Sequence, residues 1–116
     1  MIEIKKEVGR VHLILRGESI GKDMFFVLSG GMRHIGAVAM GIYDTESGRA
    51  SSSVISSPGH REDEIALHGA RKISTVTQST VVFMVGIHVD NITADEIMDI
   101  VKVSEVMVDE LIETIR

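Results

Sequence analysis

Hydrophobic residues alternate with polar ones through much of the first half of the chain, and in two later segments they recur every three or four residues. Alternation is typical of strands and the longer period is typical of helices, because the two structures repeat their side-chain directions differently. The pattern therefore predicts strands at 2–7, 10–16, 23–28, 34–43 and 50–55. It then predicts a helix at 62–78, a buried or central strand at 80–87, and a final helix that begins after Thr93.

The final helix has the clearest signature. Thr93 and Glu96 form a capping-box pattern, in which each side chain accepts a hydrogen bond from a free N–H at the helix start. Val103, Val106 and Met107 widen the apolar stripe of this helix beyond what one sheet face requires. We therefore expect part of the helix to contact another protein.

These elements predict one α+β domain over residues 1–116. The expected architecture is a largely antiparallel sheet of five or six strands with two helices packed on it, in the order β-β-β-β-β-α-β-α. The first five strands are expected to form a β-meander.

Composition excludes several classes of function. The net charge is −5 and cysteine is absent, so disulfides and thiolate metal sites are excluded. No basic cluster with interleaved aromatic residues is found, which argues against nucleic-acid binding. No apolar run approaches the length of a membrane span and the start lacks the apolar segment of a signal peptide, so we expect a soluble, cytoplasmic protein.

Candidate chemistry concentrates in two polar segments, 56–64 and 86–91, each of which precedes a predicted helix. In the first, Gly59, His60 and Arg61 lie where free N–H groups and the positive end of a helix dipole attract anions. Arg33 and His34, in a second glycine-rich segment, could face the same anion. The alternative is that Pro58-Gly59 is only a turn and that the following acids only complement the helix dipole.

The histidines allow two other interpretations. His34, His60, His88 and Asp90 could bind a first-row metal, but a histidine that bonds a carboxylate at a strand end is the more common outcome, so we expect no metal. His60 or His88 could act in acid–base catalysis with Glu62, Glu64 or Asp90. However, the sequence has no known catalytic motif, and Asp90-Asn91 could simply turn the chain.

Three stretches carry a resemblance to a known family: 34–39 (His-Ile-Gly-Ala-Val-Ala), 51–63 with Pro-Gly-His-Arg-Glu-Asp at its end, and 85–93 (Val-Gly-Ile-His-Val-Asp-Asn-Ile-Thr). Together they resemble the small prenylated-flavin chaperone-like proteins associated with gallate-type decarboxylases. The resemblance spans most of the chain. It implies a fold similar to that of proteasome-assembly chaperones, and an accessory protein that helps a decarboxylase acquire or hold prenylated FMN rather than an enzyme.

The expected function is thus a chaperone that binds prenylated FMN or FMN and a flavin-dependent decarboxylase or other assembly client. From the residue argument above, the cofactor-binding residues are expected to be Gly59, His60, Arg61, Arg33, His34 and His88. Because aromatic residues are scarce, a flavin ring should meet aliphatic and Met side chains or a site shared with a partner. We also expect a homodimer. The alternatives are a protein-interaction module of the proteasome-assembly-chaperone type without cofactor, and a small enzyme that uses His60 and His88.

Overall fold

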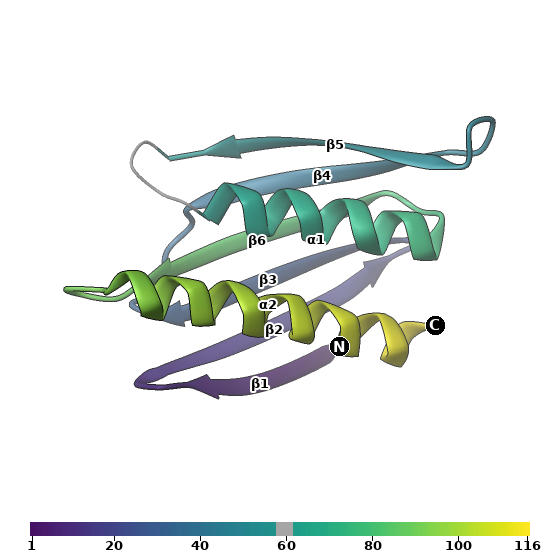
Figure 1. Cartoon of the computed structure of the whole chain (residues 1–116). Coiled ribbons are helices and arrows are strands. Elements are labelled where there is room, and N and C mark those ends of the chain that lie inside the picture. Colours follow the sequence, from purple (N-terminus) through teal and green to yellow (C-terminus); the bar gives the residue numbers. More distant parts are fainter. Residues whose placement is uncertain (58–61) are drawn as a thin grey trace.

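A six-stranded sheet with two helices on one of its faces makes up the protein (Figure 1). The computed structural model describes residues 1–57 and 62–116. The strands are β1 (Ile2–Val8), β2 (Val11–Ile20), β3 (Asp23–Gly31), β4 (Ala37–Asp44), β5 (Arg49–Ser56) and β6 (Val81–His88). The helices are α1 (Glu62–Thr77) and α2 (Ala94–Ile115), and the capping box of Thr93 and Glu96 is present. The predicted fold class and element order are confirmed.

The strand order is β1-β2-β3-β6-β4-β5, so the last strand in the sequence lies inside the sheet. β6 runs parallel to β3 and antiparallel to β4, and the other pairings are antiparallel. The predicted meander is therefore wrong beyond β3, because β6 separates β3 from β4. The prediction of a central strand at 80–87 is confirmed.

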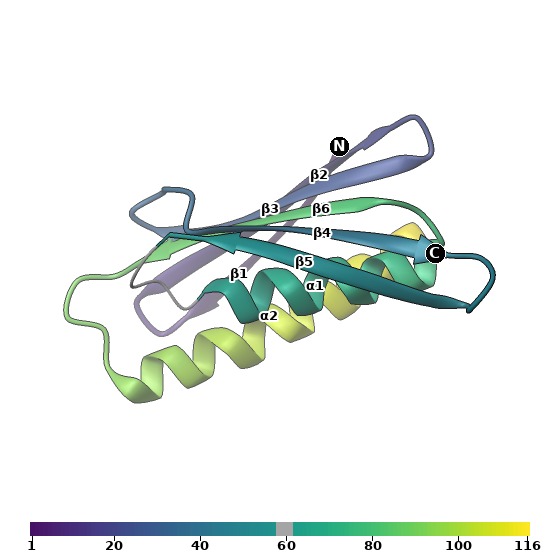
Figure 2. The same cartoon turned by 90° about the horizontal axis from the view of Figure 1, so that it is seen from above.

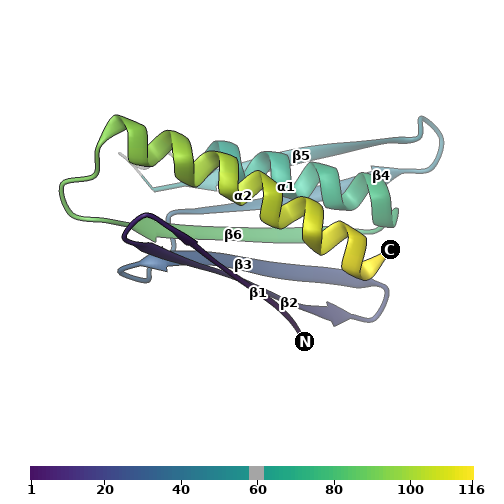
Figure 3. The same ribbon diagram turned by 60° about the horizontal axis from the view of Figure 1, so that its bottom comes forward.

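The core lies between the sheet and the helices. Phe26 and Phe83, on the parallel neighbours β3 and β6, are fully buried with ring centroids 6.3 Å apart. Ile73 of α1 and Leu111 of α2 are buried against the same layer. Figure 3 shows the two helices side by side on this face, both beginning at the same end of the sheet.

The wide apolar stripe of α2 is used mostly within the chain. Met107 is fully buried and Val103 packs against the core, whereas Val106 is exposed. The stripe is wide because α2 contacts both the sheet and α1. The reason for expecting a partner at this helix is therefore largely removed.

No described element covers the opposite face of the sheet (Figure 2), and this face carries apolar residues. Side chains alternate between the two faces of a strand, so the neighbours of the buried residues point to this side. They are half-buried or exposed, and the register brings them into adjacent rows: Phe25, Val27, Val38, Met40, Ile42, Ile55, Val82 and Met84. We call this set the open face. No helix in the described part of the chain is long and apolar enough to cross a membrane.

Replacing Phe83 with Ala should lower the free energy of unfolding by about 3–5 kcal/mol, because it removes a fully buried ring between the sheet and α1. Urea denaturation followed by circular dichroism measures the change. Ile20→Ala, at an exposed position on β2, is the control and should change stability by about 0.5 kcal/mol or less. Equal losses in the two variants would contradict the assignment of the core.

Candidate functional site

One end of the sheet gathers most of the polar side chains that the sequence singles out. β3 and β6 are parallel, so their carboxyl ends meet there, with Gly31 beside His88. β4 begins at the same end and β5 finishes there, and both helices start there. We call this region the loop end; it comprises the β1–β2 turn, residues 32–36, Ser57, Glu62 and residues 88–93.

Residues 32–36 lie directly against the end of β6. The N–H of Met32 donates to the carbonyl of His88 at 2.9 Å, and the N–H of Gly36 donates to the carbonyl of Val85 at 2.9 Å. Between these bonds the backbone passes so close to Gly86 that a Cβ there would overlap the carbonyl oxygen of His34. The predicted strand at 34–43 therefore begins only at Ala37, because residues 32–36 cross the β6 end instead of extending the β4 ladder.

Glu62, the first residue of α1, turns its side chain inward. It is only 7% exposed, and its Oε1 accepts a hydrogen bond from the N–H of Ile87 at 3.4 Å. The same oxygen lies 3.6 Å from Nε2 of His34. A Cβ on Gly36 would overlap this carboxylate, so glycine there makes room for it. Glu62 thus joins α1 to both β6 and residues 32–36, whereas the sequence suggested only a helix-dipole role or a catalytic one.

The two described histidines of the site lie close together. The rings of His34 and His88 are 6.1 Å apart and perpendicular. Nδ1 of His34 lies 3.3 Å from the Met32 carbonyl, and Nε2 of His88 lies 3.1 Å from Oδ1 of Asp90. His88 therefore has the carboxylate partner that is common for a histidine at a strand end.

Arg10, which the sequence analysis did not single out, fixes the loop after β6. Its Nε and Nη2 donate to the two carboxylate oxygens of Glu96 at 2.7 and 3.1 Å. Nη2 also donates to the carbonyl of Asp90 at 2.9 Å. Hydrogen bonds from Arg10, followed by that from the Thr93 N–H, lower the pKa of Glu96 from 4.5 to about 2. The hydrogen bond from Arg10 to Glu96 in turn raises the pKa of the guanidinium.

The structure places the predicted site residues as follows. His34 is half-buried, and Arg33 and His88 are exposed, all at the loop end. Gly59, His60 and Arg61 lie outside the described residues. Their described neighbours, however, both contact residues 34–36: the N–H of Ser57 donates to the Gly36 carbonyl at 2.8 Å, and Glu62 lies beside His34. Ser57, the start of α1 and the segment after β6 are therefore at the same end of the sheet.

Within residues 1–57 and 62–116, no three His, Asp or Glu side chains are grouped closely enough to hold a metal ion.

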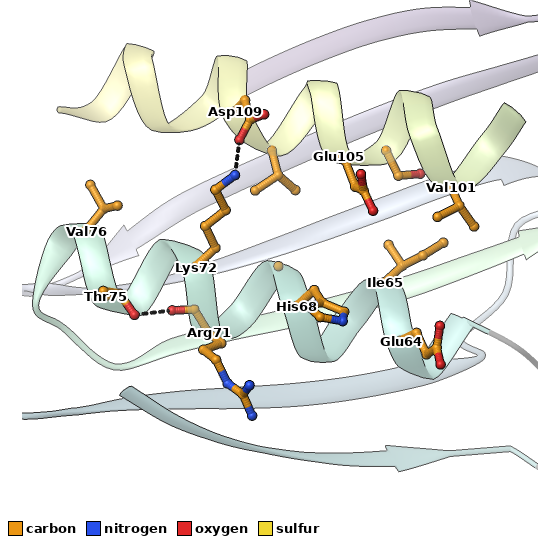
Figure 4. Close-up of a pocket in the computed structure, with 13 residues that line it drawn as sticks. Glu64, Ile65, His68, Arg71, Lys72, Thr75, Val76, Val101, Glu105 and Asp109 are labelled. Carbon is orange, nitrogen blue, oxygen red and sulfur yellow. Dashed lines mark hydrogen bonds and ion pairs between the residues drawn. The ribbon is translucent and has the colours of Figure 1, made fainter. Parts of the chain in front are cut away.

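A separate groove lies on the helix layer, between α1 and α2 (Figure 4). It has a volume of about 490 Å³, with Ile65 of α1 and Val101 and Val108 of α2 among its apolar walls. Lys72 and Asp109 form an ion pair across it. The buried hydroxyl of Ser104 also lines it and has no hydrogen-bond partner among the described residues. None of the described residues predicted for cofactor binding lines this groove.

The chain matches the family model of the prenylated flavin chaperone LpdD-like domain over residues 7–116. The chain belongs to the LpdD-like prenylated flavin chaperone family. The match covers nearly the whole chain, and it confirms the resemblance found in the sequence. Membership in the LpdD-like family supports a chaperone role. No curated protein matches the chain.

Among solved structures, this LpdD-like chain is similar to a chain in the crystal structure of a chaperone complex for yeast 20S proteasome assembly. The TM-score is 0.58 at 14% identity, and the match covers 95% of this chain and 92% of the other. At that identity the similarity concerns the fold alone. The predicted relation in fold to proteasome-assembly chaperones is confirmed.

In this LpdD-like protein, replacing Arg10 with Ala should raise the pKa of Glu96 toward 4.5, because the main stabilising partner of the carboxylate is lost. A carboxyl ¹³C NMR titration measures this pKa. In the unmodified protein, the lowered pKa means that the ionised carboxylate stabilises the fold above about pH 4.5, and that this contribution is lost as the pH falls toward 2. Arg16→Ala removes a guanidinium that bonds Glu3 instead, and should leave Glu96 unchanged. A Glu96 pKa that stays near 2 in Arg10→Ala would contradict the role given to Arg10.

Proposed function

We propose that this protein is a chaperone that helps a prenylated-FMN-dependent decarboxylase acquire or retain its cofactor, and that it binds the flavin at the loop end. The observation that carries the proposal is the composition of residues 32–35. Met32 and Ile35 are 66% and 64% exposed, and they flank Arg33 and His34. Family membership supports a chaperone connected with prenylated flavin, and this segment offers both an apolar and a cationic contact.

The apolar side chains of Met32 and Ile35 suit the ring system of a prenylated flavin. Exposed large aliphatic side chains are costly to leave in water, and a flat apolar ligand would cover them. The only described rings at the loop end are the imidazoles of His34 and His88, so the contacts to a flavin would be mainly aliphatic and thioether.

The polar residues of this segment suit the phosphate. His34 lies beside the start of α1 and Arg33 directly precedes it in the chain, and the N–H groups and dipole of a helix start favour an anion. Three acids in the first turn of α1 would oppose a phosphate. The carboxylate of Glu62, however, is turned inward onto Ile87, and Glu64 lines the α1–α2 groove instead. Arg61, as the sequence suggests, and Arg33 would then supply the charge-assisted hydrogen bonds.

FMN and prenylated FMN should bind the purified protein, and Arg61→Ala should weaken binding by about 1.5–3 kcal/mol through loss of a hydrogen bond to a charged group. Isothermal titration calorimetry measures the affinity. Arg49→Ala is the matched control: it removes an exposed arginine at the opposite end of the sheet, and it should leave the affinity unchanged. If neither flavin binds, with or without the decarboxylase, the cofactor part of the proposal is wrong.

We propose further that two copies associate through the open face. The open face spans the four strands β3, β6, β4 and β5, which at about 4.8 Å apart and about eight residues of about 3.3 Å each present roughly 500 Å². A typical stable interface buries about 800 Å² per partner and has an apolar centre with a polar rim, so the open face suits the centre and the outer residues of β1 and β2 would add to the rim. Strands β3 and β6 also read as continuous apolar runs, which is typical of strands covered on both sides.

Met40→Asp should convert this dimer to a monomer, because it places a charge within the apolar face. Sedimentation velocity should give about twice the 12.7 kDa chain mass for the unmodified protein and the chain mass for the variant. Met98→Asp makes the same change at an exposed position on α2, and it should remain dimeric. A monomeric unmodified protein, or dissociation of both variants, would contradict the interface.

A second candidate function is a protein-interaction module without cofactor, in which a client protein, in place of a second copy, would cover the open face. Affinity capture separates the candidates: flavin-dependent retention of the decarboxylase supports the cofactor chaperone, and flavin-independent retention of an assembly client supports the module. The enzymatic alternative needs His60 and His88. Normal function of a His60→Ala, His88→Ala double variant would exclude their catalytic use, and it would also exclude both histidines from flavin binding.

A further inference from the structure

The two edges of the sheet differ in how they are protected from pairing with other strands. β1 carries Glu3, Lys5, Lys6 and Glu7, and an ion pair of 2.6 Å between Lys6 and Glu110 ties it to α2. β5 has no charged residue after Arg49, no proline, and a central run of three serines followed by Val54 and Ile55. Ile55 is 81% exposed. Edge strands normally carry charges, prolines or bulges that prevent pairing, so the bare β5 edge is unusual.

The free hydrogen-bonding groups of this edge can be assigned. The N–H of Ser57 donates to the Gly36 carbonyl, so Ser57 directs its N–H toward the β4 side. In an antiparallel ladder the direction of the backbone groups alternates from one residue to the next, so Ile55, Ser53 and Ser51 also direct theirs at β4. Ala50, Ser52, Val54 and Ser56 therefore point their N–H and C=O groups outward, and no described strand lies on that side.

Arginine side chains near the β5 edge favour a ligand with negative charge. Ser52 pairs with Gly41, and Gly41 lies against the carbonyl of Ala70 on α1. The next residue, Arg71, lies at the rim of the α1–α2 groove, and its side chain extends from α1 on the side opposite α2 (Figure 4). It is exposed and forms no ion pair with any described residue. Arg49 adds a second cation at the start of β5.

These charges argue against a second copy on the edge. If two β5 strands paired antiparallel about a two-fold axis at Ser53, the outward N–H and C=O groups of one strand would face those of the other and could form hydrogen bonds. This pairing would also bring the Arg71 side chains of both copies toward the same axis, where like charges repel. An extended segment that carries carboxylates would instead form ion pairs with Arg71 and Arg49.

We propose that the β5 edge binds an extended, acidic segment of a partner protein by strand addition, with backbone bonds to Ala50, Ser52, Val54 and Ser56. Backbone hydrogen bonds give affinity in this mode, and the side chains of the added strand give specificity. The proposal is independent of flavin binding.

The probe is the peptide acetyl-Thr-Glu-Val-Glu-Val-Glu-Thr-amide, compared with a sibling that has Lys in place of each Glu. NMR hydrogen exchange on the full chain should show the amides of Ser52, Val54 and Ser56 exchanging fast alone and slowly with the acidic peptide. The amides of Ser51, Ser53 and Ile55 should be protected in both states, because they already bond β4. Protection of Ser52 and Val54 in the chain alone, rising with protein concentration, would mean that a second copy holds the edge, and would overturn the proposal.

Fluorescence anisotropy with labelled peptides tests the charge preference. The acidic peptide should bind roughly tenfold more tightly than the lysine peptide, and Arg71→Glu should reverse that order. Lys102→Glu makes the same charge change at an exposed position on α2, and it should preserve the order. Equal effects of the two substitutions, or binding of neither peptide, would overturn the proposal.

Val54→Pro removes one outward N–H and leaves the bonds to β4 in place, so it should abolish binding of the acidic peptide while circular dichroism shows the fold retained. Retained peptide binding by folded Val54→Pro would also overturn the proposal. If Val54→Pro does not fold, the Arg71→Glu and Lys102→Glu pair decides the outcome.

Discussion

Insertion of β6 between β3 and β4 is the constraint on which the rest of the structure depends. Because β6 runs parallel to β3, the two strands finish at the same end of the sheet, and the chain continues from each of them into a loop there. The loop after β3 crosses Gly86 of β6, and the loop after β6 is held by Arg10. A meander of five consecutive antiparallel strands would have separated these segments. The loop end therefore exists because of one strand pairing.

Glu62 connects this pairing to the helix layer. An acid at the first position of a helix is ordinarily an exposed partner of the dipole, but here it is buried between the β6 backbone and His34. Its position fixes where α1 starts relative to residues 32–36. The same contact turns one of the three carboxylates in the first turn of α1 away from the helix start, which reduces the electrostatic repulsion of an anion there.

Sequence reasoning identified the elements and fold class because their signals are local. The capping box, the helix periods and the apolar strands each depend on residues within a few positions of one another. The errors concern long-range contacts. The start of β4 depends on the crossing of Gly86, and Arg10 is 86 residues from Glu96, so neither has a local signature. Residues 103 and 107 looked available to a partner because the sequence does not show that α2 packs against two surfaces at once.

The candidate site was foreseen in part for the same reason. His88 and Asp90 lie two residues apart, so their contact could be expected from spacing. The approach of His34 to His88 depends on strand order, which no periodicity encodes. The exposure of Met32 and Ile35 likewise follows from the path of residues 32–36 over β6, and it became visible only in the folded chain.

The internal position of β6 also has a kinetic consequence. Until residues 81–88 are available, the sheet can exist only as two unconnected pieces, β1-β2-β3 and β4-β5, each with one unpaired apolar edge. During synthesis most of the chain would therefore emerge before the sheet could close. Pairings between distant segments slow folding and expose strand edges for longer. A protein with this strand order therefore has exposed strand edges of its own while it is being synthesised and is folding.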